Sequence, residues 1–504
     1  MLRKIRISLA IVCFTALTLL FLDFSGAFHK LFGWLAKVQL VPAVLAVNVV
    51  VIAALVLLTL LFGRVYCSVI CPLGVFQDLV AWFSKLRKKK KRFPYKFAKP
   101  LTWLRFAVLG VFVVALLFAP AMVFGLIEPY TIFGKIASNI FAPIYKLGNN
   151  VLAYFAANIN SYAFYPTEVW VKSGWVLGVA VVSFATIAVL SWRNGRIYCN
   201  SICPVGTTLG LISKFALFKP TIIESKCNRC GTCARKCKSQ CIDSKEHKID
   251  YSRCVACFDC VEACDKHAMK FVFNYDKKEH QHVSAKAATK ATEKIDSSKR
   301  DFLTVAGILT ASVALKAQES AVDGGLAVIE KKKVPKRTTS LVPAGAVSLR
   351  NVNSHCTACQ LCISACPNNV LRPSSRLENF MQPEMQYERG FCRPECTKCS
   401  SVCPTGAIEK IKKEEKSSIQ IGHAVWIRQN CLAVRDEISC SACEQHCPIG
   451  AISRVPLDEA NPQGVKIPVV DEERCIGCGA CEYLCPSRPL SAIYVEGHEV
   501  HKNT

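Results

Sequence analysis

Cysteine spacing constrains this chain more than any other feature. The sequence has 30 cysteines among 504 residues, and 24 of them form six groups of four. The run Cys-x2-Cys-x2-Cys-x3-Cys is typical of bacterial ferredoxins, where three thiolates hold three corners of a 4Fe-4S cubane and the fourth cysteine reaches a partner cluster. Zinc also accepts four thiolates, but three cysteines at this spacing favour the cubane. Six groups therefore predict six 4Fe-4S clusters.

The first two groups lie close together in the middle of the chain. We expect them to exchange their fourth cysteines, because each run of three holds one cubane and the last residue reaches across. Proline is usual after the fourth cysteine, but Lys238 and Asp265 stand there. Cys241 could compete with Cys237 as a ligand. The expected sets are Cys227/Cys230/Cys233/Cys264 and Cys254/Cys257/Cys260/Cys237.

Four further groups fill the last part of the chain, and each ends in Cys-Pro. Two keep the ferredoxin spacing, one opens its first interval to three residues and one opens it to eight. Spacing does not tell which groups exchange their fourth cysteines, so that pairing stays open. Such clusters move single electrons, and the chain has no phosphate-binding loop or dinucleotide fingerprint. The groups are Cys356/Cys359/Cys362/Cys366, Cys392/Cys396/Cys399/Cys403, Cys431/Cys440/Cys443/Cys447 and Cys475/Cys478/Cys481/Cys485.

Long uncharged runs predict a membrane domain over residues 1–218. Three runs reach the roughly 20 residues that cross about 30 Å of hydrocarbon. The first run is shorter and has a signal peptide as its alternative, but we expect a fourth span because further helices follow. The runs are Ile7–Leu22, Val38–Phe62, Phe106–Ile127 and Ser173–Trp192. The expected fold class is an α-helical polytopic membrane domain of four helices joined to α+β bacterial-ferredoxin-like domains.

Two segments of the membrane domain repeat each other. They are identical at eight of twelve positions, and each follows an even-numbered expected helix with the motif Cys-x3-Cys-Pro. A two-fold internal repeat would bring the four cysteines to one face. These thiols suit a metal, a cluster or a redox relay; redox thiols and a structural role are the alternatives. The segments are residues 63–74 and 195–206, with Cys67, Cys71, Cys199 and Cys203.

Charge sets the expected orientation. Residues 1–296 hold 38 Lys and Arg against 15 Asp and Glu, whereas residues 297–504 hold 25 against 22. The densest basic stretch, Lys85–Lys99, lies between the second and third expected helices, which predicts a cytoplasmic loop and a cytoplasmic N-terminus. The formal charge of +26 therefore indicates topology rather than a nucleic-acid surface. We expect Arg64 and Arg196 to anchor helix ends at the bilayer surface.

The chain beyond the membrane domain divides into several expected units, which we place on one or the other side of the membrane. Residues 298–303 (SKRDFL) resemble a twin-arginine export signal with lysine in first place, and an uncharged run follows them. Export would make the last domain periplasmic, and an internal linker helix is the alternative. Loop 128–172 would also be periplasmic, with 147–165 interfacial or re-entrant. The expected units are a cytoplasmic two-cluster ferredoxin at 219–274, a polar linker at 275–297, a signal or anchor helix at 298–318, a linker at 319–349 and a four-cluster ferredoxin domain at 350–504.

These motifs resemble those of a known family. The four expected helices, the two Cys-x3-Cys-Pro motifs and the two-cluster ferredoxin resemble NapH, and the NosR and CcoG membrane proteins share the motifs. The twin-arginine-like signal and the four groups with widened openings resemble NapG. The chain is therefore similar to a fusion of two normally separate proteins, without the flavin-binding domain of NosR.

The resemblance implies a quinol dehydrogenase in the bacterial inner membrane. Such a protein passes electrons from the quinol pool to a periplasmic reductase system, nitrate reductase being the best known. The implied partners are a membrane quinol, a periplasmic cytochrome or reductase and further membrane subunits, with no nucleic acid. The alternatives are a CcoG-like assembly factor that reduces copper and an electron donor to a cytoplasmic reductase. The catalytic residues stay unknown: Glu128 or Glu168 could accept a quinol proton, and His29 is expected to be interfacial rather than a quinone ligand.

Overall fold

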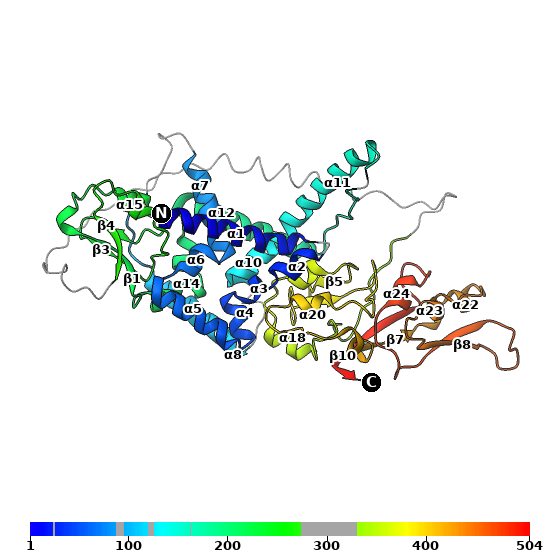
Figure 1. Ribbon diagram of the computed structural model, residues 1–504. Coiled ribbons are helices and arrows are strands. Elements are labelled where there is room, and N and C mark those ends of the chain that lie inside the picture. The colour runs from blue at the N-terminus through cyan, green and yellow to red at the C-terminus, as the bar shows by residue number, and fades with distance from the viewer. Residues whose placement is uncertain (24–25, 87–94, 119–124, 162, 274–329, 504) are drawn as a thin grey trace, which may run out of the picture.

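Three parts of the chain follow one another along the long axis of the computed structural model (Figure 1). A small cysteine-rich part lies at one end, a body of helices in the middle and the C-terminal part at the other end. The expected linker 275–297 and the expected signal or anchor helix 298–318 lie outside the described residues. The structure describes residues 1–23, 26–86, 95–118, 125–161, 163–273 and 330–503.

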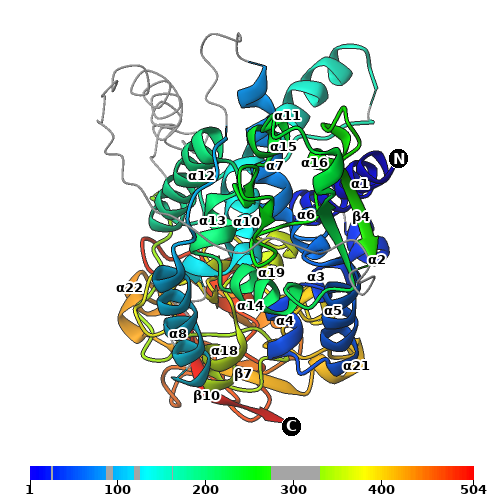
Figure 2. The ribbon, with the colours of Figure 1, turned by 90° about the vertical axis from the view of Figure 1, so that its left-hand side faces the viewer.

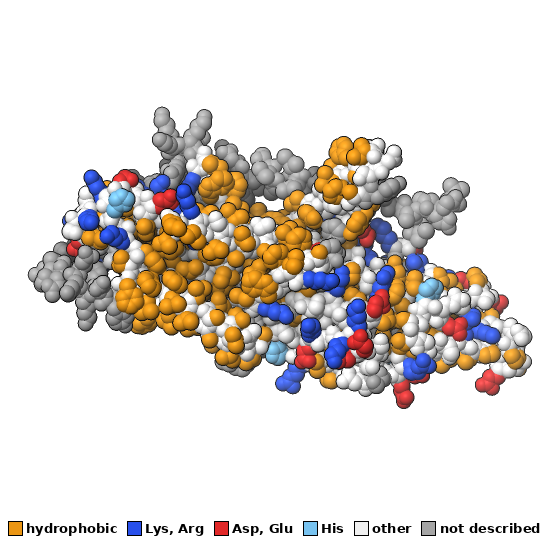
Figure 3. Space-filling view, in the orientation of Figure 1, with side chains coloured by type: hydrophobic (Ala, Val, Ile, Leu, Met, Phe, Trp, Pro, Cys, Tyr) orange, Lys and Arg blue, Asp and Glu red, His pale blue; other side chains and the backbone are white. Residues whose placement is uncertain are grey.

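Apolar helices build the body. Among the described residues, α1 (Leu2–Leu22) and α12 (Gly174–Asn194) are long and apolar enough to cross a membrane, while α5 (Val49–Phe62) and α8 (Thr102–Phe118) are apolar but shorter. Only 33% of the apolar window of α1 and 22% of that of α12 is buried inside the protein. Hydrophobic side chains therefore cover the outside of the body, as Figure 3 shows for one face. A water-soluble surface rarely carries so extended an apolar area.

Shorter helices connect and cover these four. They arise where glycine, proline or a polar residue interrupts an apolar run. They are α2 (Ala27–Phe32), α3 (Trp34–Lys37), α4 (Leu40–Leu45), α6 (Val65–Val69), α7 (Pro72–Lys85), α10 (Pro129–Ile136), a π-helix (Ala137–Phe141), α11 (Ala142–Asn158), α13 (Ile197–Ser201) and α14 (Pro204–Ser213).

The expected continuous span Val38–Phe62 is wrong in this detail, because the segment forms two helices, α4 and α5. Asn48 precedes α5, and its side chain accepts a hydrogen bond from the Val51 amide, the role that asparagine fills at a helix start. Val47 before it has a positive φ of 50°, which a continuous helix does not allow. The third expected span begins as α8, and residues 119–124 beyond it lie outside the described part.

Helix α11 takes the place of the expected interfacial or re-entrant segment 147–165. It projects from the body in Figure 1 and exposes large apolar side chains such as Tyr154 and Phe155. Such a helix fits an interfacial position better than a re-entrant one, because it makes few contacts with the body.

The two repeats adopt the same arrangement. In each, a long helix ends at a glycine with positive φ, Gly63 or Gly195, and a short helix turns back before a proline begins the next one. Proline suits the first helical turn because its missing N–H would have no partner there. The short helices return into the body, where the Tyr66 hydroxyl donates to Gln39 and the Tyr198 hydroxyl donates to the Ile127 carbonyl at 2.6 Å.

The first cysteine-rich part combines two small antiparallel sheets with two one-turn helices. It lies in front of the body when the molecule is viewed from its end (Figure 2). Strands β1 (Phe218–Ile222) and β4 (Met269–Phe273) pair with Phe218 opposite Phe273, and β2 (Ile242–Asp243) pairs with β3 (Lys248–Ile249). Helices α15 (Thr232–Lys236) and α16 (Asp259–Glu262) each carry a cysteine of one group.

The C-terminal part repeats this design twice. Its sheets pair β5 (Leu371–Pro373) with β6 (Pro383–Met385), β7 (Ile419–Trp426) with β10 (Ile493–Asn503), and β8 (Ile452–Pro456) with β9 (Lys466–Val470). Its helices are α18 (Leu349–His355), α19 (Leu361–Ala365), α20 (Lys398–Val402), α21 (Lys413–Lys416), α22 (Leu432–Arg435), α23 (Ala442–Gln445) and α24 (Ala480–Leu484).

The described end of the expected linker 319–349 packs against this part. The Arg337 guanidinium binds both carboxylate oxygens of Glu482, and the Lys332 ammonium donates to carbonyls of α24 and the residue after it. Both side chains of the Arg337–Glu482 pair are almost fully buried. Residues 330–349 therefore belong to the folded C-terminal part, which corrects the expected linker boundary.

Candidate functional site

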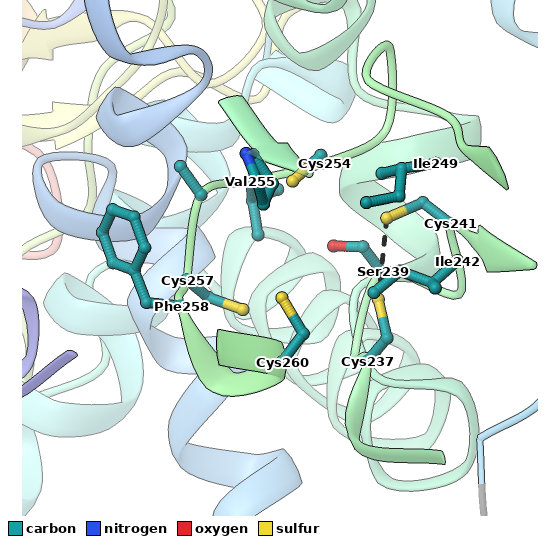
Figure 4. A pocket seen from close by; sticks show the side chains of 12 residues that line it. Cys237, Ser239, Cys241, Ile242, Ile249, Cys254, Val255, Cys257, Phe258 and Cys260 are labelled. Carbon is teal, nitrogen blue, oxygen red and sulfur yellow. Dashed lines mark hydrogen bonds between the residues drawn. The ribbon is translucent and has the colours of Figure 1, made fainter. Parts of the chain in front are cut away.

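Five cysteines of the first cysteine-rich part line one cavity. Cys254, Cys257 and Cys260 reach it from α16 and the loop before it, and Cys237 reaches it from the end of α15. Figure 4 shows these sulfur atoms around the same space, with Cys241 beside Cys237 at a sulfur-to-sulfur distance of 3.6 Å. Cys237 therefore lies with the second group, and Cys241 is close enough to compete with it.

The other set of this part reaches the surface. Cys227, Cys230 and Cys264 lie near enough to Cys233 to affect its pKa, so the fourth cysteine of the second group lies close to the first group. Cys230 is the one exposed cysteine among all thirty, each of which is described. The two expected sets are thus each brought together, and only the first is open to solvent.

In the C-terminal part, neighbouring groups exchange their fourth cysteines. The structure brings the first group together with Cys403, the second with Cys366, the third with Cys485 and the fourth with Cys447. Three of these sets each line a separate cavity. In the remaining set, Cys392, Cys366 and Cys396 lie near enough to Cys399 to affect its pKa. The arrangement answers the question that spacing left open. The sets are Cys356/Cys359/Cys362/Cys403, Cys392/Cys396/Cys399/Cys366, Cys431/Cys440/Cys443/Cys485 and Cys475/Cys478/Cys481/Cys447.

Cys440 follows the widest interval of any group, with eight residues between it and Cys431. It still lines one cavity with Cys431 and Cys443 of its own group, and Cys485 of the neighbouring group completes the set. Cys440 lies in the irregular segment between α22 and α23 and is only partly buried, whereas Cys431 is buried. Helix α22 lies within the eight-residue interval, so the chain returns to the cavity at Cys440 after the helix ends. Cys440 stays a candidate ligand, and only the fourth cysteine of its set comes from another group.

Backbone geometry explains the regular spacing. In each of the four regularly spaced groups, the second cysteine stands between two residues with positive φ, which curl the loop around the cavity. Amides in such turns form a concave surface that favours negative charge. The two widened groups lack such a pair in the described chain, so their loops need the extra residues to turn. The flanking pairs are Arg229/Gly231, Ala256/Phe258, Ala358/Gln360 and Gly477/Gly479.

The four repeat cysteines meet inside the body. Each is at most 4% exposed, and the charges of Cys67, Cys71 and Cys199 all act on Cys203. Cys71 and Cys203 immediately precede α7 and α14, so the positive ends of both helix dipoles face the thiols. The Gln77 amide donates to the Cys199 sulfur at 3.2 Å, and the Gly206 amide donates to the Cys203 sulfur at 3.3 Å.

Arg64 and Arg196 lie inside the protein, which corrects their expected role as anchors at the bilayer surface. Both are fully buried, and each crosses to the other repeat. Arg64 donates to the Cys199 carbonyl at 3.1 Å and approaches the Cys67 sulfur at 3.8 Å, while Arg196 donates to the Cys67 carbonyl at 2.6 Å. The two cations therefore tie the repeats together around the thiols.

A buried carboxylate that sequence reasoning missed balances part of this positive charge. Asp78 of α7 binds Arg196 at 2.8 Å, Arg6 at 2.7 Å and Lys238 at 3.4 Å. Lys238 also binds Asp259 of the first cysteine-rich part at 3.1 Å. No sequence signal pointed to Asp78, because an isolated acid in an amphipathic helix usually faces water.

The cysteine sets form a row through the molecule. Arg64 lies near enough to Cys254 of the first cysteine-rich part and to Cys199 of the second repeat for its charge to favour the thiolate form of both. Glu128 lies near enough to Cys71 of the repeat and to Cys359 of the C-terminal part for its charge to raise the pKa of both thiols. Within that part, the Cys392 amide donates to the Cys478 carbonyl at 2.9 Å.

The acids and the histidine noted from the sequence have different surroundings. Glu128 is 1% exposed and caps α10 through the Thr131 amide, whereas Glu168 is largely exposed and pairs with Arg389 of the C-terminal part. His29 pairs with Asp23 at 3.0 Å, and its side chain is 8% exposed. Glu128 is thus buried rather than solvated, and the ring of His29 is largely covered by the protein.

Lysines approach the sets of the C-terminal part. The Lys416 ammonium donates to the Cys392 sulfur at 3.1 Å and is 5% exposed. Burial lowers the pKa of Lys135, near Cys359, to about 7, although Glu128 and the thiol oppose this shift. Burial likewise lowers the pKa of Lys332 to about 8. Cations near cluster ligands stabilise the more negative, reduced form of a cluster.

The residues present fit 4Fe-4S clusters. Burial raises the pKa of many ligand thiols, for example Cys359 and Cys478 to about 12, so these would lose their protons only on binding metal. In the part of the chain that the structure describes, no three His, Cys, Asp or Glu side chains come close enough to hold one metal ion. A cubane offers four separate irons, and each ferredoxin set offers four separate thiols.

Two family models match the chain. One, described as a 4Fe-4S binding domain, matches residues 44–94 and 176–222, which are the two repeats. The other, described as a 4Fe-4S dicluster domain, matches residues 355–433 and 438–488. The first dicluster match holds the first two groups, and the second holds the fourth group with most of the third.

The boundary between the two dicluster matches divides one set. Cys431 falls in the first match and Cys440 in the second, although both line the same cavity in the structure. The long interval between these two cysteines explains the division, because it departs from regular ferredoxin spacing. The cavity therefore defines the set, and the matches show only that both halves are dicluster-like.

Several known proteins are similar to parts of the chain. YccM of Escherichia coli, named as an electron transport protein, is 23% identical over 227 residues, which are 44% of this chain and 55% of YccM. The ferredoxin-type protein NapH of Haemophilus influenzae is 26% identical over 235 residues, 44% of this chain and 68% of NapH. The methylamine utilization ferredoxin-type protein MauM of Methylophilus methylotrophus is 34% identical over 168 residues, 32% of this chain and 72% of MauM. No solved structure matches the chain.

Proposed function

Because this chain belongs to the family of ferredoxin-type iron-sulfur proteins that includes NapH and MauM, we propose that it oxidises quinol in a membrane and passes the electrons to a partner on the far side. That it is an iron-sulfur electron-transfer protein follows from its two 4Fe-4S family matches and its relatives. The proposed acceptor is a periplasmic cytochrome or reductase.

The row of cysteine sets carries this proposal. The two-cluster ferredoxin lies at one end of the helical body and the four-cluster part at the other (Figure 1), and the repeat cysteines are buried in the body. The six ferredoxin sets would each hold one 4Fe-4S cluster, which stores and releases one electron. An apolar helical body alone would separate the two ferredoxin parts by about 30 Å of hydrocarbon. A redox centre at the buried repeat cysteines would shorten the distance that an electron crosses in one step.

We assign a seventh redox centre to Cys67, Cys71, Cys199 and Cys203. Four buried thiols facing two helix starts suit an iron-sulfur cluster, whose separate irons each take one thiolate. Arg64, Arg196 and Gln77 would hold the thiolate charge in place. The match of both repeats to a 4Fe-4S binding domain supports iron over copper, which the rival role in copper reduction would require.

The proposed orientation places four spans near α1, α5, α8 and α12. The first cysteine-rich part contacts the described end of the basic loop, where Arg253 donates to the Ala98 carbonyl at 2.8 Å. The C-terminal part contacts the opposite loop, where Lys172 donates to the Ile363 carbonyl at 3.0 Å. This arrangement favours a cytoplasmic first ferredoxin and a periplasmic C-terminal domain.

The exposed Cys230 favours a second candidate function, exchange of electrons with a soluble carrier on the first ferredoxin side. Electron transfer from quinol to a periplasmic partner does not by itself require a surface-exposed cysteine set in the first cysteine-rich part. Exposed Lys226, Arg229 and Arg235 surround it and would suit an acidic carrier.

Reduction by quinol tests the proposed function. Purified full-length protein is mixed with menadiol or decylubiquinol, and the EPR signals of reduced clusters are followed together with iron and copper analysis. We expect quinol to reduce the clusters and about 24 or more irons per chain. Dithionite gives the full reducible signal for comparison. Clusters that dithionite reduces and quinol leaves oxidised would contradict the quinol donor.

Replacing Cys71 and Cys203 by serine tests the seventh centre. We expect the six ferredoxin clusters to form, the iron content to fall by the share of one centre, and electrons to stop passing between the two ferredoxin parts. Cys13→Ser is the matched control, because Cys13 of α1 belongs to no set. An unchanged metal content in the double variant would contradict this assignment.

A further inference from the structure

We propose that His29 and Asp23 form the site that binds the quinol head group and takes its proton. This inference rests on the proposed function, since it assigns the substrate site of the same reaction. Asp23 directly follows α1 and His29 lies in α2, at the end of the body that faces the C-terminal part (Figure 1).

Asp23 holds the imidazole in one orientation. Its two carboxylate oxygens accept the Gly26 amide at 2.8 Å, the Phe28 amide at 2.9 Å and the His29 Nδ1 at 3.0 Å. Hydrogen bonds donated to a carboxylate favour its charged form. It keeps the proton of neutral His29 on Nδ1, which leaves Nε2 as the acceptor.

The Nε2 atom of His29 has no hydrogen-bond partner in the described chain, although it is buried. The imidazole side chain is 8% exposed and the Asp23 side chain 2%. A buried polar atom without a partner costs about 1–3 kcal/mol, so a ligand hydroxyl there would recover that energy. Burial lowers the pKa of His29 although Asp23 opposes it, which keeps the ring neutral and ready to accept a proton.

The surroundings suit a lipid-soluble ligand. Helices α2 and α3 expose Leu31 at 67% and Trp34 at 59%, next to exposed Lys30 and Lys37. Apolar and aromatic side chains beside cations are typical of a helix lying in a membrane interface. The segment follows α1, a helix of spanning length, so its apolar face would meet the lipid in which a quinol tail dissolves.

An electron acceptor lies beside the same segment. A side chain added at Gly26 would meet the Lys398 ammonium at 3.1 Å. Lys398 begins α20 and directly precedes Cys399 of the set Cys392/Cys396/Cys399/Cys366. Electrons leaving a quinol at His29 would therefore have a ferredoxin set of the C-terminal part close by.

The chemistry balances with iron-sulfur clusters as the oxidant. Breaking the first O–H bond of the quinol transfers its proton to Nε2, and the Asp23 carboxylate stabilises the imidazolium. One electron leaves for a neighbouring cluster. After His29 has released its proton to solvent, the second O–H bond breaks in the same way and the second electron follows. The products are quinone, two protons and two clusters reduced by one electron each.

Variants of His29 in the full-length protein test the site. In His29→Ala, we expect the rate of cluster reduction by decylubiquinol to fall roughly 100-fold, the size of a lost general base. In His29→Gln, whose amide can bind but not take the proton, kcat should fall more than KM rises. His498→Gln is the matched control, because His498 lies on β10 of the C-terminal part.

Two further readouts separate the outcomes. The iron content and the EPR signals after dithionite should match the wild type, which shows that the variants are folded and loaded. Binding of a fluorescent hydroxyquinoline N-oxide, a quinol analogue, should weaken in His29→Ala. Wild-type protein that quinol fails to reduce would contradict the proposed function. Wild-type reduction with unchanged rate and binding in His29→Ala would overturn the His29 site alone.

Discussion

Asp78 is the residue whose loss would disturb the most parts of the molecule. It joins Arg6 of α1, Arg196 of the second repeat and Lys238 of the first cysteine-rich part. Replacing it by asparagine keeps its shape and removes its charge, so three buried cations lose their partner. Breaking a buried ion pair from one side costs about 3–5 kcal/mol.

We therefore expect Asp78→Asn to lower the melting temperature of the detergent-solubilised protein and to loosen the first ferredoxin, which would raise its proteolysis rate. Asp436→Asn is the control, because Asp436 forms an exposed pair with Arg435. Equal melting temperatures for the two variants would contradict the role of Asp78.

Lys416 is expected to raise one reduction potential. Its ammonium donates to the Cys392 sulfur at 3.1 Å and to the Arg393 and Cys396 carbonyls. In Lys416→Met, the loss of this positive charge should shift the potential of one cluster negative by on the order of 100 mV. Redox titration followed by EPR measures it. Lys413→Met, on the exposed side of the same helix, should leave every potential unchanged.

The sequence predicts the role of some single residues and not of others. Cysteine ligands were predictable because cluster geometry imposes fixed spacing on the chain. The buried partners Asp78, Lys416 and Asp23 were not, since each is a single charged residue whose partner comes from a distant segment. Glu128 was noted as an acid of a predicted loop, but sequence alone does not tell that this loop is covered by the rest of the protein.

Cys440 shows where the spacing rule itself stops. Its type and its place before Cys443 indicated a ligand, but the eight-residue interval carries no fixed geometry and the partner from the next group comes from folding. The cavity that Cys440 shares with Cys485 supplied the missing partner.

Segments between the regular elements decide much of the packing. Residues 330–349 are rich in lysine and proline, which predicted a linker, but they cover α24 and the end of β10. Arg337 donates to both oxygens of Glu482 and to the Val495 carbonyl at 2.7 Å. Composition therefore predicted this boundary at the wrong place. In the same way, the uncharged run 38–62 gave no sign of the break between two helices at Asn48.

Removing Arg337 should destabilise the C-terminal part. Arg337→Leu leaves Glu482 buried without its partner, which costs about 3–5 kcal/mol. We expect a lower melting temperature and iron loss from the two sets that include Cys481 and Cys485. The double variant Arg337→Leu/Glu482→Leu should recover part of the loss. Lys336→Leu, at the neighbouring exposed position, should have no effect, and an equal loss there would contradict the ion-pair explanation.

At the scale of the whole molecule, the two ferredoxin parts attach to opposite ends of the helical body (Figure 1). The C-terminal part is held by loop 128–172, where Arg372 and Arg389 stack on the Trp170 ring at 4.4 and 4.8 Å and Asn139 donates to Gln360 at 2.7 Å. The basic loop lies with the first ferredoxin instead. If the body spans a membrane, this arrangement favours opposite sides of it for the two parts.

Fusion reporters measure this orientation directly. Alkaline phosphatase is active only after export, and green fluorescent protein fluoresces after folding in the cytoplasm. We expect phosphatase fused after Thr504 to be active, and fluorescent protein inserted in the basic loop 87–94 to fluoresce. Lys299→Gln combined with Arg300→Gln should abolish the phosphatase activity, because these residues supply the twin-arginine-like signal.

The neighbouring change Lys294→Gln is the control for charge alone and should leave export intact. Fluorescence of a reporter after Thr504, with inactive phosphatase at the same position, would place both ferredoxin parts in the cytoplasm. The body could not then separate them, and the contacts of Trp170 and Asn139 with the C-terminal part could not form in the membrane-inserted protein. The orientation experiment therefore tests the packing of the whole molecule as well as its topology.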